Sequence, residues 1–146
     1  MTKPNLAIVL SRFNQEVTSG LLNGAVTYLA EHGIAAPQIH HAPGAFEIPL
    51  IAKALAQSGR YDGVICLGCV IKGDTAHFEY ISLGATMGLM TASLETGVPL
   101  TLGILTTYTD EQAVVRSRDD SHNNGREAAA ACVEALETLI ATRQPV

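Results

Sequence analysis

Apolar residues along this chain gather in four short runs, each about as long as a buried strand. The runs cover residues 6–10, 37–43, 63–71 and 99–106. Continuous apolar runs of this length are typical of parallel strands that are covered on both faces. The second run, PQIHHAP, lies between two prolines and is the weakest of the four signals. We therefore predict four strands.

Apolar residues recur at helical spacing between and after these runs. In the first such pattern, Val17, Leu21, Ala25 and Leu29 share one face, and Gly33 supplies the end. The predicted helices cover residues 17–30, 49–58, 77–96, 110–116 and 125–142. Strands that alternate with helices form right-handed crossovers and a parallel sheet. The expected fold class is α/β, a flavodoxin-like three-layer α/β/α sandwich with a four-stranded parallel sheet, in one domain that spans residues 1–146.

The predicted helix at 77–96 has two apolar stripes instead of one. At 100° per residue, one stripe consists of Phe78, Ile81, Ala85, Leu89 and Ala92. A second stripe, nearly opposite, consists of Leu83, Met87, Met90 and Leu94. One stripe can cover the sheet, and self-association is the economical explanation of the other. The alternative is that neighbouring helices of the same chain cover both stripes.

Composition narrows the possible environment and partners. Hydrophobic residues make up 47% of the chain and charged residues only 16%, which also favours association. The net charge of −5 and the lack of any Lys/Arg cluster argue against a nucleic-acid binder. No run approaches the roughly 20 apolar residues of a membrane span, and no signal-peptide pattern follows the first residues. Since the three cysteines suit a reducing compartment, we expect a cytoplasmic protein.

Cys66 and Cys69 form a C-x-x-C pair, which raises a redox or zinc hypothesis. Both lie in the predicted strand at 63–71, where residues three apart point to opposite faces. Two thiols placed in this way cannot close a disulfide unless the backbone bends. We therefore interpret both as filler of the core.

The loops after the predicted strands carry the candidate chemistry, because ligands of parallel α/β sheets bind at the carboxyl ends of the strands. Phe13 and Phe46 follow the first two strands and could hold a flat heterocycle between them, or could instead pin the helix entries. The segment KGDTAHF places a flexible glycine before a helix start, which suits an anion such as phosphate. Asp74 in this segment could equally cap the helix.

Among the five histidines, only His77 both follows a predicted strand and opens a predicted helix, and we expect a carboxylate, of Glu47 or Asp74, nearby. An imidazole at such a position is suited to proton transfer at neutral pH, although a lone histidine is more often structural. The chain has no G-x-S-x-G elbow, no Walker loop and no H-E-x-x-H motif. A reaction that needs positioning, an anion pocket and one proton shuttle fits this pattern.

Four segments together resemble the lumazine synthase family. They are RFN, PGAFEIP, LGCVIKGDTAHFEYI and GILTTYTDEQAVVR…NNG, and the match runs from Leu6 to Leu139. The resemblance implies condensation of 5-amino-6-(D-ribitylamino)uracil with 3,4-dihydroxy-2-butanone 4-phosphate, which yields 6,7-dimethyl-8-ribityllumazine, phosphate and water. This is the penultimate step of riboflavin synthesis. The family uses no cofactor and no metal, and the nucleophilic amine belongs to the substrate.

The resemblance also implies a substrate site. Its members would be Phe13, Gly44, Ala45, Phe46, Glu47, Val70, Ile71, Lys72, Gly73, Asp74, Thr75, Leu102, Arg116 and Asn124, with His77 as the general acid/base. Phe13 would stack on the pyrimidine ring, and the residues after the second strand would bind the ribityl chain. The residues after the third strand would hold the heterocycle and phosphate. Arg116 would bind the phosphate, and Leu102 would form an apolar wall.

Two positions depart from the family pattern. Many members have arginine where Lys72 stands, and many have lysine where this chain has Asn124. The second change removes a cation, for which Arg118 or Arg126 could compensate. A non-catalytic relative that binds flavin or lumazine, or that serves as an assembly, is therefore the alternative function.

The resemblance further implies a homopentamer. In some members of the family, such pentamers pack into decamers or 60-subunit shells. The active site would lie between subunits, with Phe13, Phe46 and His77 of one chain facing Leu102 and Arg116 of the next. Riboflavin synthase is a further partner that the resemblance raises.

Overall fold

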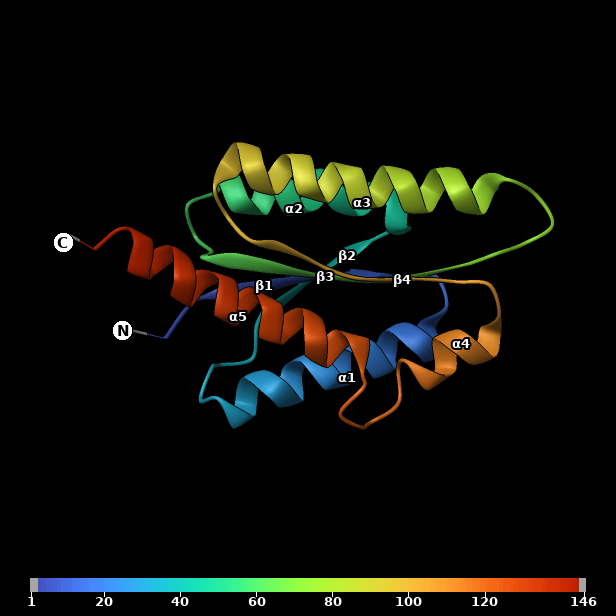
Figure 1. Cartoon of the computed structure of the whole chain (residues 1–146), viewed down its shortest axis with the longest axis horizontal. Helices are drawn as coiled ribbons and strands as arrows, with labels where there is room; N and C mark the ends of the chain where they lie inside the picture. The colour runs from blue at the N-terminus through green and yellow to red at the C-terminus, as the bar shows by residue number, and fades with distance from the viewer. Residues whose placement is uncertain (1–2, 145–146) are drawn as a thin grey trace.

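The computed structural model describes residues 3–144, and its centre is a four-stranded parallel sheet (Figure 1). The strands are β1 (Leu6–Ser11), β2 (Gln38–Ala42), β3 (Gly63–Ile71) and β4 (Leu100–Thr107), in the order β2-β1-β3-β4. Leu10 of β1 pairs with His41 of β2 on one side and with Leu67 of β3 on the other. The predicted four-stranded parallel sheet is confirmed.

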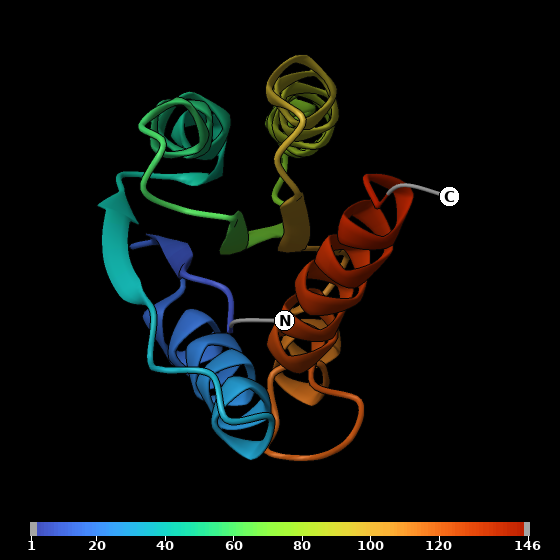
Figure 2. The same cartoon turned by 90° about the vertical axis from the view of Figure 1, so that its left-hand side faces the viewer.

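Helices cover both faces of this sheet. They are α1 (Gln15–Glu31), α2 (Ile48–Gln57), α3 (His77–Thr96), α4 (Asp110–Val115) and α5 (Asn124–Thr142), with a 3₁₀ turn, η1 (Ala45–Glu47), before α2. Figures 1 and 2 show α2 and α3 on one face and α1, α4 and α5 on the other. None of the helices between residues 3 and 144 combines the length and the apolar character that crossing a membrane would require.

Alternate residues of the central strands enter two separate cores. Ile8 and Leu10 of β1 pack with α1 and α5, whereas Ala7 and Val9 pack with α2 and α3. All six residues of β1 are buried, which explains its continuous apolar sequence. By contrast, β2 pairs on one side only and exposes several residues, which explains its weaker signal.

The two cysteines of β3 face opposite cores, as predicted. Cys66 belongs to the core under α2 and α3, and Cys69 to the core under α1 and α5. Burial raises the pKa of the Cys69 thiol to about 11, with a smaller contribution from the Asp110 carboxylate. Burial likewise raises the pKa of Cys66. Both groups therefore stay protonated at neutral pH, consistent with their interpretation as core filler.

The second stripe of α3 lies at the surface. Ala85, Leu89 and Ala92 of the first stripe are buried, and this stripe covers the sheet. In the second stripe, Leu83, Met87, Met90 and Leu94 remain 59–76% exposed. The alternative, in which neighbouring helices of the same chain cover both stripes, is therefore wrong.

Candidate active site

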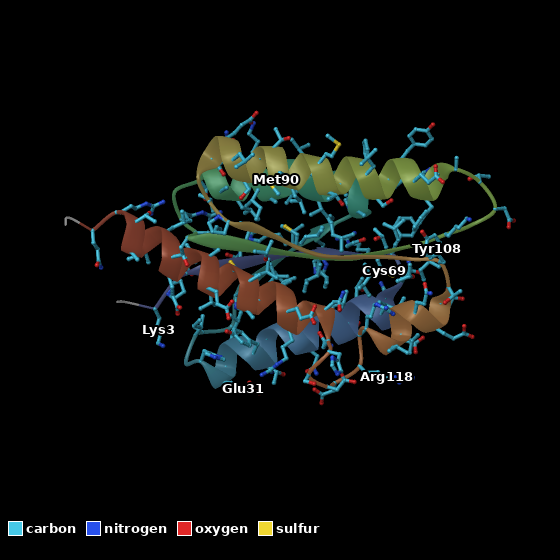
Figure 3. All side chains as sticks on the ribbon, in the orientation of Figure 1. Lys3, Glu31, Cys69, Met90, Tyr108 and Arg118 are labelled. Carbon is cyan, nitrogen blue, oxygen red and sulfur yellow. The ribbon has the colours of Figure 1, made fainter. Side chains whose placement is uncertain are left out.

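A pocket of about 330 Å³ lies where β1, β2 and β3 end, and it gathers much of the predicted site. Its walls come from the loop after β1, the turn after β2, the last residues of β3 and the start of α3. The predicted residues that line it are Phe13, Gly44, Ala45, Glu47, Val70, Ile71 and His77. Asn14, Cys69 and Ile81 complete the lining. Figure 3 labels Cys69 and Tyr108 near this end of the sheet.

Gly44 lies close to two side chains of the predicted site, Phe13 and Glu47. A Cβ at this position would lie 3.4 Å from ring carbons of Phe13 and 3.2 Å from Oε1 of Glu47. The Phe13 side chain is 66% exposed and lines the pocket, so its ring offers a flat apolar surface. An aromatic face and a carboxylate therefore border the same space, which suits a heterocycle that carries a polar chain.

Asn14 is a pocket residue that the sequence reasoning missed. Its backbone is left-handed, with φ of 57°, and its side-chain amide donates a hydrogen bond of 3.1 Å to the carbonyl of Cys69. This bond ties the loop that carries Phe13 to the end of β3. Two features of the sequence could have indicated Asn14 as a pocket residue. It follows Phe13 directly, and asparagine tolerates the left-handed region better than most residues.

Phe46 does not line the pocket. A Cβ at Gly84 of α3 would lie 2.9 Å from the Phe46 ring, so this ring packs against α3, and the side chain is 57% exposed. Within one chain, Phe13 and Phe46 therefore do not enclose a heterocycle between them in this pocket.

The loop from 72 to 75 leads from β3 into α3. Its residues Lys72, Gly73, Asp74 and Thr75 are exposed. The backbone N–H of Lys72 donates to the Thr107 carbonyl at 2.9 Å, and its ammonium lies 5.8 Å from the centre of the Tyr108 ring. Asp74 does not cap α3, because the hydroxyl of Thr75 accepts the hydrogen bond from the N–H of His77 at 3.3 Å.

His77 is the first residue of α3, and it is the histidine that lines this pocket. Other histidines contact groups elsewhere: Nδ1 of His32 lies 2.8 Å from the Tyr28 carbonyl, and Nε2 of His40 lies 3.3 Å from the Tyr61 hydroxyl. The imidazole of His77 and the carboxylate of Glu47 therefore border one cavity, where a proton can pass to or from a bound molecule.

The three remaining predicted residues do not line this pocket. Leu102 lies on the edge strand β4 and is 50% exposed. Arg116 ends α4, and one of its guanidinium nitrogens donates to the carbonyl of Gln112 at 3.0 Å. The N–H of Asn124, the first residue of α5, donates to the Arg116 carbonyl at 2.9 Å. The structure thus brings Arg116 and Asn124 together, but outside the pocket that His77 lines.

Of the two arginines that could replace the cation missing at Asn124, Arg126 is already paired. Its guanidinium lies 2.6 Å from the Glu31 carboxylate and 5.4 Å from the centre of the Tyr28 ring. The hydrogen bond from Arg126 lowers the pKa of Glu31. Arg118 is exposed and lies two residues after Arg116, so it is the better candidate to compensate for the lysine that many family members have at position 124.

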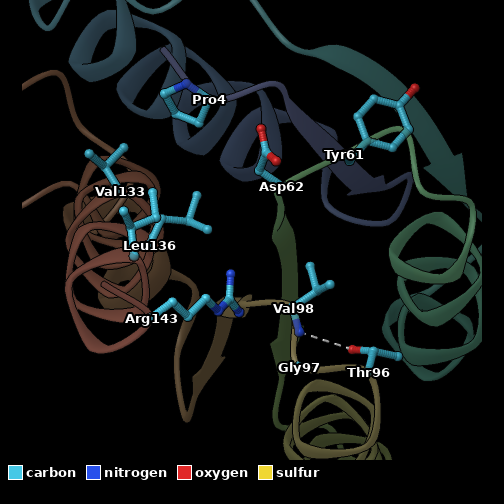
Figure 4. Close-up of a pocket in the computed structure, with 10 residues that line it drawn as sticks. Pro4, Tyr61, Asp62, Thr96, Gly97, Val98, Val133, Leu136 and Arg143 are labelled. Carbon is cyan, nitrogen blue, oxygen red and sulfur yellow. Dashed lines mark hydrogen bonds between the residues drawn. The ribbon is translucent and has the colours of Figure 1, made fainter. Parts of the chain in front are cut away.

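A second cavity, of about 310 Å³, lies at the opposite end of the sheet (Figure 4). Its walls include Pro4, Asp62, Val98 and Leu136. The Asp62 carboxylate accepts a hydrogen bond of 2.8 Å from the backbone N–H of Asn5, so its polar group already has a partner. No predicted site residue lines this cavity, and parallel sheets bind ligands at the other end.

Comparison with known proteins agrees with this geometry. The family model described as 6,7-dimethyl-8-ribityllumazine synthase matches residues 3–139. The chain is 63% identical over 143 residues to 6,7-dimethyl-8-ribityllumazine synthase 1 of Caulobacter vibrioides, which covers 97% of this chain and 94% of that protein. It is 48% identical over 136 residues to the 6,7-dimethyl-8-ribityllumazine synthase of Salinibacter ruber, covering 92% of this chain and 86% of that protein. The chain therefore belongs to the 6,7-dimethyl-8-ribityllumazine synthase family.

Proposed function

We propose that this chain condenses 5-amino-6-(D-ribitylamino)uracil with 3,4-dihydroxy-2-butanone 4-phosphate. The products are 6,7-dimethyl-8-ribityllumazine, phosphate and water, and the enzyme is a transferase of riboflavin biosynthesis. The observation that carries this conclusion is 63% identity, over 97% of the chain, to a protein named for the same product. The pocket at the ends of β1, β2 and β3 supports it with groups that suit these substrates.

In this reaction the chain orients two substrates and moves protons. The flat face of Phe13 supports the pyrimidine, and the Glu47 carboxylate accepts hydrogen bonds from the ribityl hydroxyls. The substrate amine attacks the ketone carbonyl of the butanone, so the protein needs no nucleophile of its own. The imidazole of His77 takes the proton from the attacking nitrogen and returns one to the departing oxygen. Much of the remaining acceleration comes from holding the amine against the carbonyl.

Leu102, Arg116 and Asn124 of a neighbouring copy complete the site in this proposal. Two surfaces support a shared site. One is the exposed stripe of α3, and the other is a groove of about 760 Å³ between α3, β4 and α5, with apolar walls such as Leu100 and Leu139. We propose that the stripe of one chain packs in the groove of the next, which is a head-to-tail contact, and that the rotation between subunits closes a ring of five. We also propose a cytoplasmic location, which suits three free, buried cysteines.

The direct test mixes the purified chain with both substrates and follows lumazine fluorescence against a reaction without protein. We expect turnover well above the spontaneous rate. An equal rate with and without protein would reject the proposed activity, and tight binding of lumazine or flavin without turnover would favour the non-catalytic alternative. Native mass spectrometry of the same sample distinguishes a pentamer from a decamer or a 60-subunit shell.

Replacing His77 with alanine should lower kcat by about tenfold, below the usual range of general acid–base catalysis. The effect is moderate because the imidazole is exposed, so water can carry the proton in its place. Steady-state kinetics of the wild type and of the variant, with both substrates at saturating concentration, measures this. His32→Ala removes an exposed imidazole at the end of α1 and should leave kcat unchanged. Equal rates in wild type and His77→Ala would exclude the assigned role.

A further inference from the structure

Asn123 is a buried polar residue at the junction of α1, α5 and the segment before α5. Its side chain is only 1% exposed, although it lies in a polar loop sequence. Its amide nitrogen donates hydrogen bonds of 3.0 Å to the carbonyl of Gly20 and 2.8 Å to the carbonyl of Arg118. Its amide oxygen accepts a bond of 3.0 Å from the N–H of Arg126, which caps α5. Both donors of the amide and its acceptor are therefore used.

Glycines on both helices allow α1 and α5 to approach closely around the Asn123 amide. A Cβ at Gly24 of α1 would lie 2.0 Å from the amide oxygen of Asn123. A Cβ at Gly125 would lie 1.9 Å from the carbonyl of Leu21. Real Cβ atoms do not approach so closely, so α1 and α5 meet in one register, with the Asn123 amide between them.

This junction reaches Arg116 through the backbone. The N–H of Asn124, next to Asn123, donates to the Arg116 carbonyl at 2.9 Å. The N–H of Asn123 itself donates to the carbonyl of Asp120 at 3.3 Å, and its side chain holds the carbonyl of Arg118. The segment from 116 to 124 is thus a closed loop whose two ends touch. It meets α1 at Ser117, which packs against Gly20, and through the buried amide of Asn123, which bonds to the Gly20 carbonyl.

We propose that Asn123 is the positioning residue of the phosphate subsite. It holds the loop that presents Arg116 and Asn124, and it does not touch the substrate itself. This inference rests on the proposed function, in which Arg116 binds the phosphate of the butanone. A guanidinium grips phosphate through two parallel hydrogen bonds, and this geometry tolerates little displacement. Without the hydrogen bonds of this amide to the Gly20 and Arg118 carbonyls, the loop presents Arg116 in a wider range of positions.

The first test is Asn123→Ser, because serine still caps a helix but cannot reach the carbonyls of Gly20 and Arg118. We expect the KM for the butanone phosphate to rise roughly tenfold, by the sensitivity of catalysis to small misplacement. The KM for the pyrimidine should stay within twofold, since the pocket of Phe13 and His77 is untouched. The inhibition constant of inorganic phosphate should rise with the first KM. If Asn123→Ser left both phosphate readouts at wild-type values, the residue would be only a helix cap and the inference would fail.

A second pair of variants separates packing from positioning. Gly24→Ala should displace the Asn123 amide and raise the KM for the butanone phosphate in the same way. In the double variant Gly24→Ala with Asn123→Ala, the new methyl occupies the space left by the amide, so the unfolding midpoint should lie above that of Gly24→Ala alone. The KM should nevertheless stay raised, since the bonds to Gly20 and Arg118 are still missing. Recovery of the wild-type KM in the double variant would overturn the inference.

Asn5→Ala is the matched control, because its amide joins two segments at the opposite end of the sheet through a 2.7 Å bond to the Arg60 carbonyl. It should leave both KM values unchanged. Turnover of the wild-type chain in the same assay keeps the two ideas apart. An inactive wild type refutes the proposed function, whereas an active wild type with equal sensitivity of both substrates to Asn123→Ser refutes only the role of Asn123.

Discussion

Replacing Arg116 with alanine should raise the KM for 3,4-dihydroxy-2-butanone 4-phosphate by roughly 100-fold, since a charge-assisted contact to phosphate contributes about 3 kcal/mol. The KM for the pyrimidine should change little. Arg116 ends α4 with an exposed side chain, and only one of its nitrogens donates to its own helix, at 3.0 Å to Gln112. Within residues 3–144 this is the one hydrogen bond of the guanidinium, so its remaining donors can bind an anion. Steady-state kinetics with each substrate varied in turn measures the effect.

Two further variants define what Arg116 supplies. Arg116→Lys keeps the charge but loses the planar pair of donors, so we expect an intermediate KM. Arg60→Ala makes the same change in net charge at the far end of the sheet, where the guanidinium lies 5.2 Å from the centre of the Tyr61 ring. This control should behave as wild type. An unchanged KM in Arg116→Ala would show that the phosphate binds elsewhere.

The sheet was predictable because central parallel strands leave a direct trace in the sequence. Every residue of β1 is buried, so nearly all of its positions must be apolar. The second apolar stripe of α3 was equally visible. Its exposure was the favoured interpretation, because few predicted elements were left to cover it, and the exposed side chains bear this out. The 3₁₀ turn η1 was not predicted, since apolar spacing over three residues carries no helical signal.

The candidate site was predictable only in part. The order of strands and loops places Phe13 and His77 at one end of the sheet, and both line the same pocket. Asn14 has a left-handed backbone and bonds to the carbonyl of Cys69, which is distant in the sequence. At the start of α3, the hydroxyl of Thr75, and not the carboxylate of Asp74, accepts the hydrogen bond from the N–H of His77. Such choices depend on the local path of the loop, which residue types alone do not define.

The double substitution Met87→Glu and Met90→Glu should break the assembly and lower activity by 100-fold or more. Both side chains are more than 60% exposed in the single chain, so the folded subunit tolerates the change. Buried in a subunit interface, each unpaired carboxylate costs several kcal/mol. Sedimentation should show monomers, and turnover should fall because Arg116 no longer reaches the pocket of His77. The control is the double substitution Ser19→Glu and Asn23→Glu, at exposed positions of α1. It adds the same charge to another face and should leave assembly and turnover intact.

Subunit mixing tests the same shared site without disturbing the interface. Chains with His77→Ala and chains with Arg116→Ala are each impaired, and each lacks a different half of the site. In randomly mixed rings, about a quarter of the interfaces pair an intact His77 with an intact Arg116 from the neighbouring chain. Co-refolded mixtures should therefore be several-fold more active than the mean of the two parents assayed alone. If mixing restores nothing, each chain must hold both groups in its own site, and head-to-tail assembly cannot be the reason that Arg116 acts on the substrate.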